Sequence, residues 1–553
     1  MRVLFWLAAA VSVCAQQMPS CSAALWSPCD LTFPLEAGED AARVELRAEF
    51  RSPHKDTRTL RAFRDGNTLV MRFTPDEVGE WDYRITSSLK RLDGQLGKTA
   101  GTPSQAPGFV RTANVHHFQT ANLQPHLWMG SEIANFVAIP RAEFESQLAA
   151  RAAEKFTHIR VTLEPSTDLK EAASRIQAIH DRGIVIDIAL ASLPDDRRER
   201  ERYVTDVVAR FSAFNITWVG VPAYENLRNA RTILKELGTL LQQLDGYKHI
   251  RTTLAESSSA TLLSDNWMNV VSYGTPDPNI GAVEHQLVAL PAVNSGIKTR
   301  ADLWAATMNG QYPSSGSGRD FAVWFDILSK TRHWELEPYF EVSGGRAVAV
   351  RDVELRGGDI QDAVEYLVYV AKPGPVELTV EDHGYDVAWI NPATGDRVAA
   401  KNYKGKSFAG EPPDREHDWV LHVSREGHKQ GMLKTYKFES RPIRMQTPET
   451  DPKTVPFEIE TPAGEISMRT PPLFSLKINR ATRATRELNV VWTAELTTGT
   501  ADGGRVVGTG REGTLRLPSF YSERLPAILS LRAAILNANG KVYIIDRAFR
   551  IIP

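Results

Sequence analysis

The stretch ITWVGVPAYEN, residues 216–226, decides the fold and the site that we expect. It begins as an apolar run and ends with one carboxylate, Glu225, which is typical of a buried parallel strand followed by its C-terminal loop. In a (β/α)8 barrel the reactive groups stand at the C-terminal ends of the strands. If similar strands surround this one, Glu225 lies at the mouth of a barrel.

Short apolar runs alternate with amphipathic segments between residues 116 and 335, which is typical of parallel βα units. The expected strands are 127–131, 158–163, 184–190, 216–221, 249–254, 269–273 and 287–293, with a weaker eighth near 307–311. The clearest helices between them are expected at 141–155, 168–181 and 196–214. The pattern predicts a (β/α)8 TIM-type barrel.

Segments with period-two alternation and Gly or Pro turns lie on both sides of this region. The predicted fold class is multidomain α/β plus all-β, with a central barrel flanked by an N-terminal β-sandwich and two C-terminal β-sandwich-like domains. The expected boundaries are 1–15 for a signal peptide, 22–112 for the N-terminal β-sandwich, 116–335 for the barrel, 336–425 for the next β-sandwich and 436–553 for an immunoglobulin-like domain.

Charge and the first residues limit the partners and the location. The 65 Lys and Arg against 67 Asp and Glu give a net charge of -2, which argues against a nucleic-acid surface and suits a neutral polysaccharide or oligosaccharide. Arg2, the apolar run 3–13 and the small residue Ala15 indicate a cleaved secretory signal, so we expect a secreted or periplasmic protein. A lipoprotein anchor at Cys14 is the alternative. No later stretch is apolar enough for a membrane span.

Cleavage after Ala15 leaves Cys21 and Cys29 as the remaining cysteines. In an oxidising compartment this pair predicts a local disulfide, with two free thiols as the alternative. The cysteines have no neighbouring ligand pair, so we expect no metal and no cofactor.

Four motifs resemble secreted multidomain glycoside hydrolases of the apiosidase-like type. They are FRDGNTLVMRFTPDEVGEWDYRITSS (63–88), RYVTDVVARFSAFNITWVGVPAYEN (202–226), LQQLDGYKHIRTT (241–253) and INPATGDR (390–397). The resemblance covers roughly residues 24–397 and implies an N-terminal β-domain, a catalytic barrel and a C-terminal β-domain. The last domain carries no such signal.

The resemblance implies two catalytic carboxylates, of which this chain keeps one. Glu225 matches the acid/base glutamate of the fourth strand, although it follows Ala223-Tyr224 where the family usually has Asn. In LPAVNSGIKTRADLWAATMNG (290–310), the nucleophile position aligns with Ser295, or with Gly296 if the register slips. Neither residue can replace a carboxylate in a retaining glycosidase.

Other acids follow the strands and are candidates for the second role. Glu164 and Glu256 are preferred over Glu132 and Asp277 because each follows its strand within a few residues; exposed loop acids are the alternative for all four. A Ser/His/Asp site at Ser295 is disfavoured, because no Gly-x-Ser-x-Gly elbow surrounds it.

Aromatic and polar residues at the expected strand ends are candidates for sugar contacts. Trp128 and Trp267 rank ahead of Trp218 and Trp304 as stacking platforms, with core packing as the alternative. Tyr273 is placed where related barrels have a residue that hydrogen-bonds the nucleophile, with core packing as the alternative. The full set of expected sugar contacts is Trp128, Trp267, Tyr224, Tyr273, Asn294 and Ser295.

The sequence therefore predicts a secreted glycoside-hydrolase-like protein that acts on or binds polysaccharide, with Glu225 as acid/base and no aligned nucleophile. The alternative is a catalytically inactive glycan-binding or structural cell-surface protein on the same scaffold.

Overall fold

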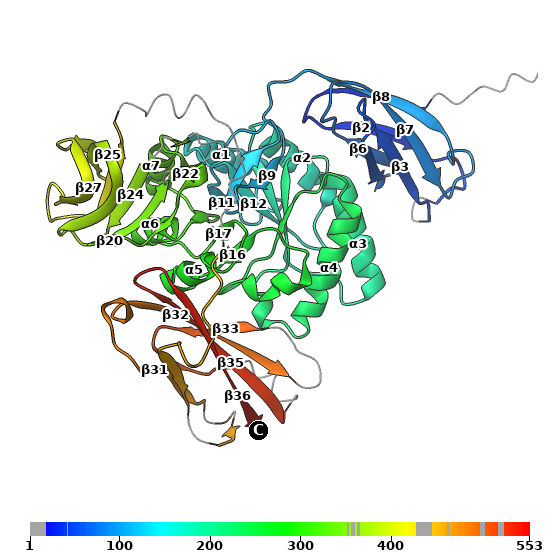
Figure 1. Ribbon diagram of the computed structural model, residues 1–553. Helices are drawn as coiled ribbons and strands as arrows, with labels where there is room; N and C mark the ends of the chain where they lie inside the picture. The colour runs from blue at the N-terminus through cyan, green and yellow to red at the C-terminus, as the bar shows by residue number, and fades with distance from the viewer. Residues whose placement is uncertain are drawn as a thin grey trace, which may run out of the picture. The chain divides into compact units, whose positions relative to one another are not determined.

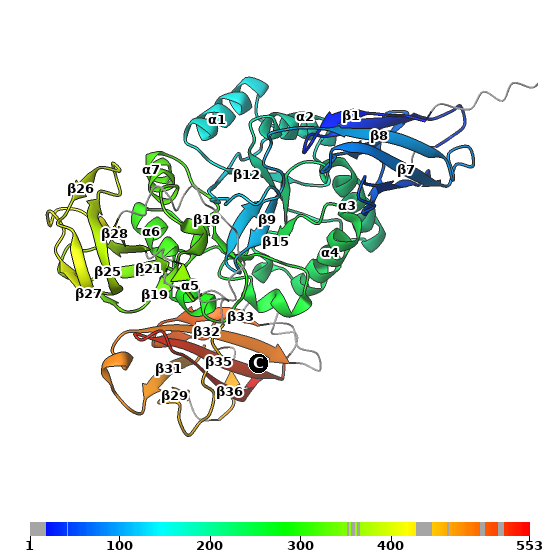
Figure 2. The same ribbon diagram turned by 45° about the horizontal axis from the view of Figure 1, so that its top comes forward.

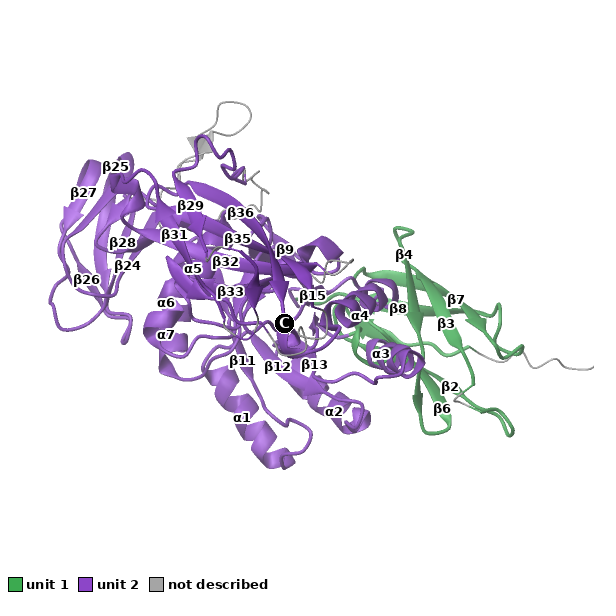
Figure 3. Cartoon of the chain, turned by 90° about the horizontal axis from the view of Figure 1, so that it is seen from below, with its two compact units in different colours: residues 1–105, 209–213 green, residues 106–208, 214–553 purple. Residues whose placement is uncertain are grey.

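The computed structural model describes residues 18–553 apart from 41–42, 351–352, 355–359, 362–364, 427–444, 462–463, 468, 470, 498–503 and 518–524. The chain forms two compact units, residues 1–105 with 209–213 and residues 106–208 with 214–553 (Figure 3). The predicted signal peptide and Cys14 lie outside the described residues. Three of the predicted domains lie in the second unit.

The first unit is built from two sheets, with strand orders β1-β8-β7-β3-β4 and β2-β6-β5. Side chains alternate between buried and exposed along β3 and β7, so each strand gives one face to a shared core. Phe50 of one sheet stacks on Phe73 of the other with ring centroids 4.5 Å apart. The strands are β1 (Ser22–Ala24), β2 (Cys29–Pro34), β3 (Leu46–Arg51), β4 (Thr57–Arg61), β5 (Phe63–Asp65), β6 (Thr68–Phe73), β7 (Gly79–Ser87) and β8 (Leu96–Thr102).

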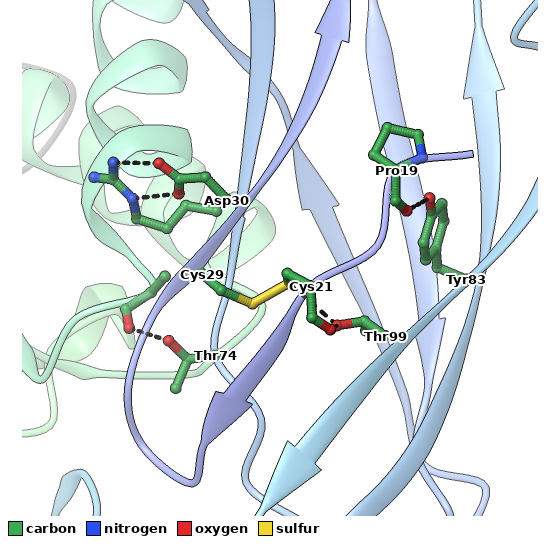
Figure 4. Close-up of a disulfide and its surroundings, with 9 residues drawn as sticks. Pro19, Cys21, Cys29, Asp30, Thr74, Tyr83 and Thr99 are labelled. Atoms are coloured by element: carbon green, nitrogen blue, oxygen red, sulfur yellow. Dashed lines mark hydrogen bonds and ion pairs between the residues drawn. A yellow bond between two sulfur atoms is a disulfide. The ribbon is translucent and has the colours of Figure 1, made fainter. Parts of the chain in front are cut away.

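A disulfide between Cys21 and Cys29 ties the first residues of this unit to strand β2 (Figure 4). This is the pair expected from the sequence. Thr99 donates a hydrogen bond to the carbonyl of Cys21, and the hydroxyl of Tyr83 donates to the carbonyl of Pro19. The N-terminal segment is thus fixed to the sheet by covalent and polar contacts.

The second unit begins with the hairpin β9 (Val110–Ala113) and β10 (His117–Thr120) and continues into eight parallel strands (Figure 1). Five of these strands form the sheet β11-β12-β13-β14-β15, and three form β16-β17-β18. All six residues of β13 are buried, as expected for a strand covered on both faces. The strands are β11 (Gly130–Glu132), β12 (His158–Leu163), β13 (Val185–Leu190), β14 (Ile216–Val219), β15 (Ile250–Thr252), β16 (Val271–Tyr273), β17 (Ala292–Asn294) and β18 (Gln311–Pro313).

A helix or short 3-10 turn follows each of these strands, and Figure 2 shows α1 to α4 beside the five-stranded sheet. Capping residues explain several starts: Asp168 accepts from two backbone N–H groups at the start of α2, and Thr299 and Asp302 form a capping box on α6. The helices are α1 (Arg141–Ala153), α2 (Leu169–His180), α3 (Arg197–Phe211), η1 (Tyr224–Asn226), α4 (Ala230–Leu244), η2 (Ala260–Asp265), α5 (Pro278–His285), α6 (Arg300–Met308), α7 (Arg319–Leu328) and η3 (His333–Glu335).

Hydrogen bonds join the five-stranded parallel sheet to the three-stranded one at both of its edges. Between β15 and β16, the Thr252 hydroxyl lies 2.9 Å from the carbonyl oxygen of Val270. Between β11 and the loop after β18, the Ser131 hydroxyl lies 2.6 Å from the carbonyl oxygen of Gly316. The sheets therefore share two seams.

The remaining sheets of the second unit are antiparallel, apart from one parallel pair of strands near the C-terminus. One sheet, in the order β19-β21-β24-β28-β25-β20 with β26 and β27 paired to β25, follows the α/β region. Its strands and a short hairpin are β19 (Glu337–Tyr339), β20 (Val342–Ser343), β21 (Arg346–Val350), β22 (Val353–Glu354), β23 (Ile360–Gln361), β24 (Glu365–Val370), β25 (Val376–Ile390), β26 (Arg397–Ala399), β27 (Tyr403–Gly410) and β28 (Trp419–Arg425).

The last residues form a three-stranded and a five-stranded sheet, ordered β29-β31-β34 and β30-β36-β35-β32-β33. Phe474 and Trp492 pack in their shared core with ring centroids 4.5 Å apart. Residues of β32 and β35 also share an apolar cluster with α5. The elements are β29 (Phe457–Glu460), β30 (Ile466–Ser467), β31 (Leu473–Ile478), η4 (Arg483–Thr485), β32 (Leu488–Thr497), β33 (Arg505–Thr509), β34 (Glu512–Thr514), β35 (Ala527–Asn537) and β36 (Val542–Ile552).

Most expected strands and helices of the α/β region lie within a few residues of the observed ones. The largest differences are at its end, where the strand expected at 287–293 is observed at Ala292–Asn294 and the strand expected near 307–311 at Gln311–Pro313. Among the described residues, no helix is both long and apolar enough to cross a membrane.

Candidate functional site

Glu225 lies beyond the C-terminal end of β14, in the 3-10 turn η1. The chain between them runs alongside the segment after β15: the amide of Ala223 donates to the carbonyl of Leu254 over 2.8 Å. Parallel pairing thus continues past the formal end of both strands. It brings the Glu225 side chain to the loop that contains Glu256.

Both oxygens of the Glu225 carboxylate accept hydrogen bonds from this loop. The amide nitrogen of Glu256 lies 3.0 Å from Oε1 and 3.1 Å from Oε2, and the amide nitrogen of Ser257 lies 3.2 Å from Oε1. In return, the Asn226 side-chain amide donates to Oε1 of Glu256 over 2.7 Å. Two of the three predicted catalytic residues, Glu225 and Glu256, are therefore neighbours, and each is hydrogen-bonded to the other's loop.

Partial burial raises the pKa of Glu225, and the negative charge of Glu256 acts in the same direction. The backbone N–H groups of Glu256 and Ser257 oppose this shift because they favour the ionised carboxylate. The group therefore combines two properties: an environment that retains a proton and hydrogen bonds that anchor the loop.

The residues around Glu225 are fixed by further contacts. Tyr224 is buried, and its hydroxyl donates to the carbonyl of Ser258 over 3.0 Å. The guanidinium of Arg505, on β33, donates to the main-chain carbonyl of Glu225 over 3.0 Å. The predicted sugar contact through Tyr224 is wrong for this structure, because the phenol faces the protein interior.

The position expected to carry the nucleophile holds no acid. Ser295 follows β17, and its hydroxyl donates to the carbonyl of Tyr273 over 3.1 Å. An ideal Cβ on Gly296 would lie 2.4 Å from the amide nitrogen of Thr275, so no side chain fits there. Neither possible register therefore places a carboxylate at this position.

The side chains of Asn294 and Tyr273 are also buried and form hydrogen bonds within the protein. The buried Asn294 amide donates to the carbonyl of Thr275 over 3.0 Å and to Oε1 of Gln311 over 2.8 Å. Tyr273 is 2% exposed, and its side chain hydrogen-bonds to Glu284 of α5. The expected contacts of Asn294 and Tyr273 with sugar are therefore wrong, because neither side chain reaches solvent.

Glu284 was not identified from the sequence. It is buried on α5, where its Oε2 accepts a hydrogen bond from the Ser258 hydroxyl over 2.5 Å, and burial raises its pKa to about 7. An acid inside an otherwise apolar helix, NIGAVEH, is the only signal that could have drawn attention to it.

The other acids at the strand ends are separate from Glu225. A carboxylate oxygen of Glu132 lies 3.8 Å from the guanidinium of Arg160. Asp277 caps α5 by accepting from the amide of Asn279 and also accepts from Thr509. Glu164 is exposed after β12.

The four tryptophans considered as platforms are core residues. Trp128 is 1% exposed, precedes β11 at its N-terminal end, and stacks on His158 with ring centroids 3.5 Å apart. Trp267 is also 1% exposed, and its ring lies against Gly238 of α4. Trp218 and Trp304 are fully buried. None presents a ring face to a ligand, so the platform interpretation is wrong for all four.

Two open cavities are formed by other residues. One, of about 650 Å³, is lined mainly by the starts of α6 and α7 and by loops beside β24 and β28, including Arg300, Tyr369 and Asp418. The other, of about 630 Å³, is lined by residues at the end of β32, the start of β35 and the paired part of β36. Neither contains a predicted site residue. Among the described residues, His116, His285 and Glu337 form a group whose ligand atoms lie within 4.8 Å of one another.

Comparisons with known proteins support the fold. Residues 22–88 match a family described as a domain of unknown function, DUF5060. No curated protein matches the chain. A protein from Bacteroides vulgatus ATCC 8482 assigned as a glycoside hydrolase is similar with a TM-score of 0.61 and 16% identity, over 74% of this chain and 100% of that one.

A glycoside hydrolase family 5 protein from the same organism is similar with a TM-score of 0.50 and 13% identity, over 60% of this chain and 96% of that one. At these identities the similarity concerns the fold alone. The chain is thus glycoside-hydrolase-like in its fold.

Proposed function

We propose that this chain is a secreted glycoside-hydrolase-like protein that binds polysaccharide at the mouth of a (β/α)8 barrel and does not hydrolyse it by the retaining mechanism. The observation that carries the proposal is the state of Glu225, whose two carboxylate oxygens both accept hydrogen bonds from the backbone of residues 256 and 257.

The order of strands and helices along the chain supports the proposed barrel. Eight parallel strands alternate with helices or turns, and hydrogen bonds cross both seams between the five-stranded and three-stranded sheets. In this architecture the loops after the strands form the binding face. The match of residues 22–88 and the flanking β-sheets are in keeping with a multidomain protein of the apiosidase-like type.

The chemistry explains why retaining hydrolysis is not proposed. A retaining glycosidase places two carboxyl groups about 5–5.5 Å apart, one as acid/base and one as nucleophile. Here Glu225 holds a loop, and the position expected to face it carries Ser295, whose hydroxyl is directed to a backbone carbonyl. A hydroxyl without a base does not form the glycosyl-enzyme intermediate.

Glycan binding does not require the pair of catalytic carboxylates that hydrolysis requires. Glu164 and Glu256 are exposed in the loops after β12 and β15, two strands of the same parallel sheet, and carboxylates accept hydrogen bonds from sugar hydroxyl groups. The disulfide between Cys21 and Cys29 suits an oxidising, extracytoplasmic compartment.

One observation favours a second candidate, hydrolysis with Glu225 as acid and Glu256 as its partner. The two carboxylates belong to neighbouring loops, and burial raises the pKa of Glu225. Catalytic pairs commonly combine one carboxyl with a raised pKa and one that stays ionised.

Affinity electrophoresis against plant and bacterial polysaccharides tests the binding proposal, with oligosaccharide titration for the glycans that retard the protein. We expect Glu164→Gln or Glu256→Gln to weaken binding about tenfold, because each removes a charged hydrogen-bond acceptor. Glu201→Gln, on the partly exposed face of α3, is the matched control and should bind like the wild type. Absence of binding to every glycan, or equal loss in all three variants, contradicts a site at the strand ends.

A further inference from the structure

Three histidines surround one carboxylate at the junction of the hairpin, α5 and β19. Oε2 of Glu337 lies 3.0 Å from Nδ1 of His116 and 2.6 Å from Nε2 of His285. Nε2 of His117 lies 3.3 Å from Oε1. The cluster joins residues that are 52 and 221 positions apart in the sequence.

The imidazole rings are buried and closely packed. The rings of His116 and His285 have centroids 4.0 Å apart, and both side chains are at most 5% exposed. The Glu337 side chain keeps 27% exposure, so solvent reaches the cluster from its side. A small ion therefore has a path to the ring nitrogens.

The hydrogen bond made by Nε2 of His116 determines which ring nitrogen carries the lone pair in the neutral ring. Nε2 lies 2.9 Å from the carbonyl oxygen of Val288 and donates to it. In the neutral ring, Nδ1 then carries its lone pair toward the Glu337 carboxylate. Two lone pairs at this distance repel unless a proton or a cation lies between them. Histidines that ligate metals commonly donate the other ring N–H to a backbone carbonyl in this way.

The ligand types in this cluster favour some metal ions over others. Two imidazoles and one carboxylate are ligands of zinc and related divalent transition metals, whereas calcium and magnesium prefer oxygen ligands. Zinc–ligand bonds of about 2.0–2.1 Å place neighbouring tetrahedral ligand atoms about 3.3 Å apart. The distances from Oε2 of Glu337 to His116 and His285, 3.0 Å and 2.6 Å, are shorter than this, so binding an ion requires the side chains to move apart.

We propose that His116, His285 and Glu337 bind a divalent transition-metal ion. Such an ion would link the hairpin before the parallel strands, the end of α5 and the first strand of the following sheet. Its role would be structural and independent of glycan binding. No metal is expected from the sequence, because the ligands are scattered and only the adjacent pair His116-His117 hints at them.

The test uses the untagged full-length chain, stripped with a chelator and dialysed against excess Zn²⁺. Elemental analysis should find one zinc per chain, and added Zn²⁺ should raise the Tm by several degrees because only the folded state binds it. Cobalt provides a local readout: Co²⁺ bound to nitrogen and oxygen ligands should give visible absorption bands that Zn²⁺ abolishes by displacement.

Glu337→Gln should lose both the bound zinc and the cobalt bands. The matched control is Glu365→Gln, because Glu365 forms a buried pair with His422 over the same distance, 2.6 Å, outside the cluster. This control should lower the Tm and still bind zinc. If Glu337→Gln does not fold, His285→Asn serves in its place.

A wild-type chain that retains no zinc and shows no change in Tm would overturn the proposal. The same conclusion follows if Glu337→Gln binds zinc as the wild type does, or if Glu365→Gln loses it.

Discussion

The backbone amide of Glu256 donates to the carboxylate of Glu225, with 3.0 Å between the nitrogen and Oε1. This bond joins the loops after β14 and β15, and the Asn226 side chain strengthens the link by donating to Glu256. A glutamate expected to donate a proton to a substrate is thus occupied in holding a neighbouring loop.

Glu225→Ala should release the loop around residues 255–258, because it removes the acceptor of two backbone N–H groups. We expect faster hydrogen exchange at the amides of Glu256 and Ser257 and a free energy of unfolding lower by about 1–3 kcal/mol. Hydrogen exchange with mass spectrometry measures the first effect. Glu164→Ala, an exposed glutamate after β12, is the control and should leave these amides unchanged.

The stability difference between the wild type and Glu225→Gln should depend on pH. Since burial raises the pKa of Glu225, the folded state holds the proton more tightly than the unfolded chain. The stabilising contribution is then greatest below the ordinary glutamate pKa and declines as pH rises through the raised value. Urea unfolding at a series of pH values measures it; a difference that grows with rising pH would mean that the backbone hydrogen bonds outweigh burial.

Gly238→Ala should destabilise the protein although alanine is the better helix former. An added Cβ would lie 2.2 Å from Cγ of Trp267, so the buried indole must move. Overpacking costs about 1–3 kcal/mol. Helix propensity returns about 1 kcal/mol, so we expect a net loss of up to about 2 kcal/mol. In a Trp267→Leu background the same substitution should cost less, and an equal cost in both backgrounds would contradict this packing.

Replacing both Cys21 and Cys29 by Ser should lower the free energy of unfolding by about 2–3 kcal/mol, because the disulfide closes a short loop in the unfolded chain. Denaturant unfolding followed by tryptophan fluorescence, which reports on the buried Trp81, measures the change. A reducing agent should destabilise the wild type and have no effect on the double variant. An equal response of both proteins would show that the bond does not support this unit.

The element pattern of the α/β region could be predicted because buried parallel strands and amphipathic helices leave strong local signals. The strand predicted at 158–163, for example, is observed at His158–Leu163. The roles of the site residues could not be predicted in this way. The sequence shows a tryptophan at position 267 close to an expected strand. It does not show that the ring of Trp267 packs against Gly238 of α4.

Contacts between distant segments caused the remaining errors. The hydrogen bonds to Glu225 come from a loop 31 residues later, and strand spacing alone does not tell whether a carboxylate faces solvent or a neighbouring backbone. The same limit hid Glu284, whose partners Ser258 and Tyr273 precede it on two other segments.

Turnover by the wild type and by Glu225→Gln tests the central claim most directly, through release of reducing sugar from the glycans that bind and of chromophore from a panel of aryl glycosides. Our account predicts no release by either protein and the same glycan affinity for both. Hydrolysis by the wild type that falls by several powers of ten in Glu225→Gln would contradict it and assign Glu225 the role of catalytic acid.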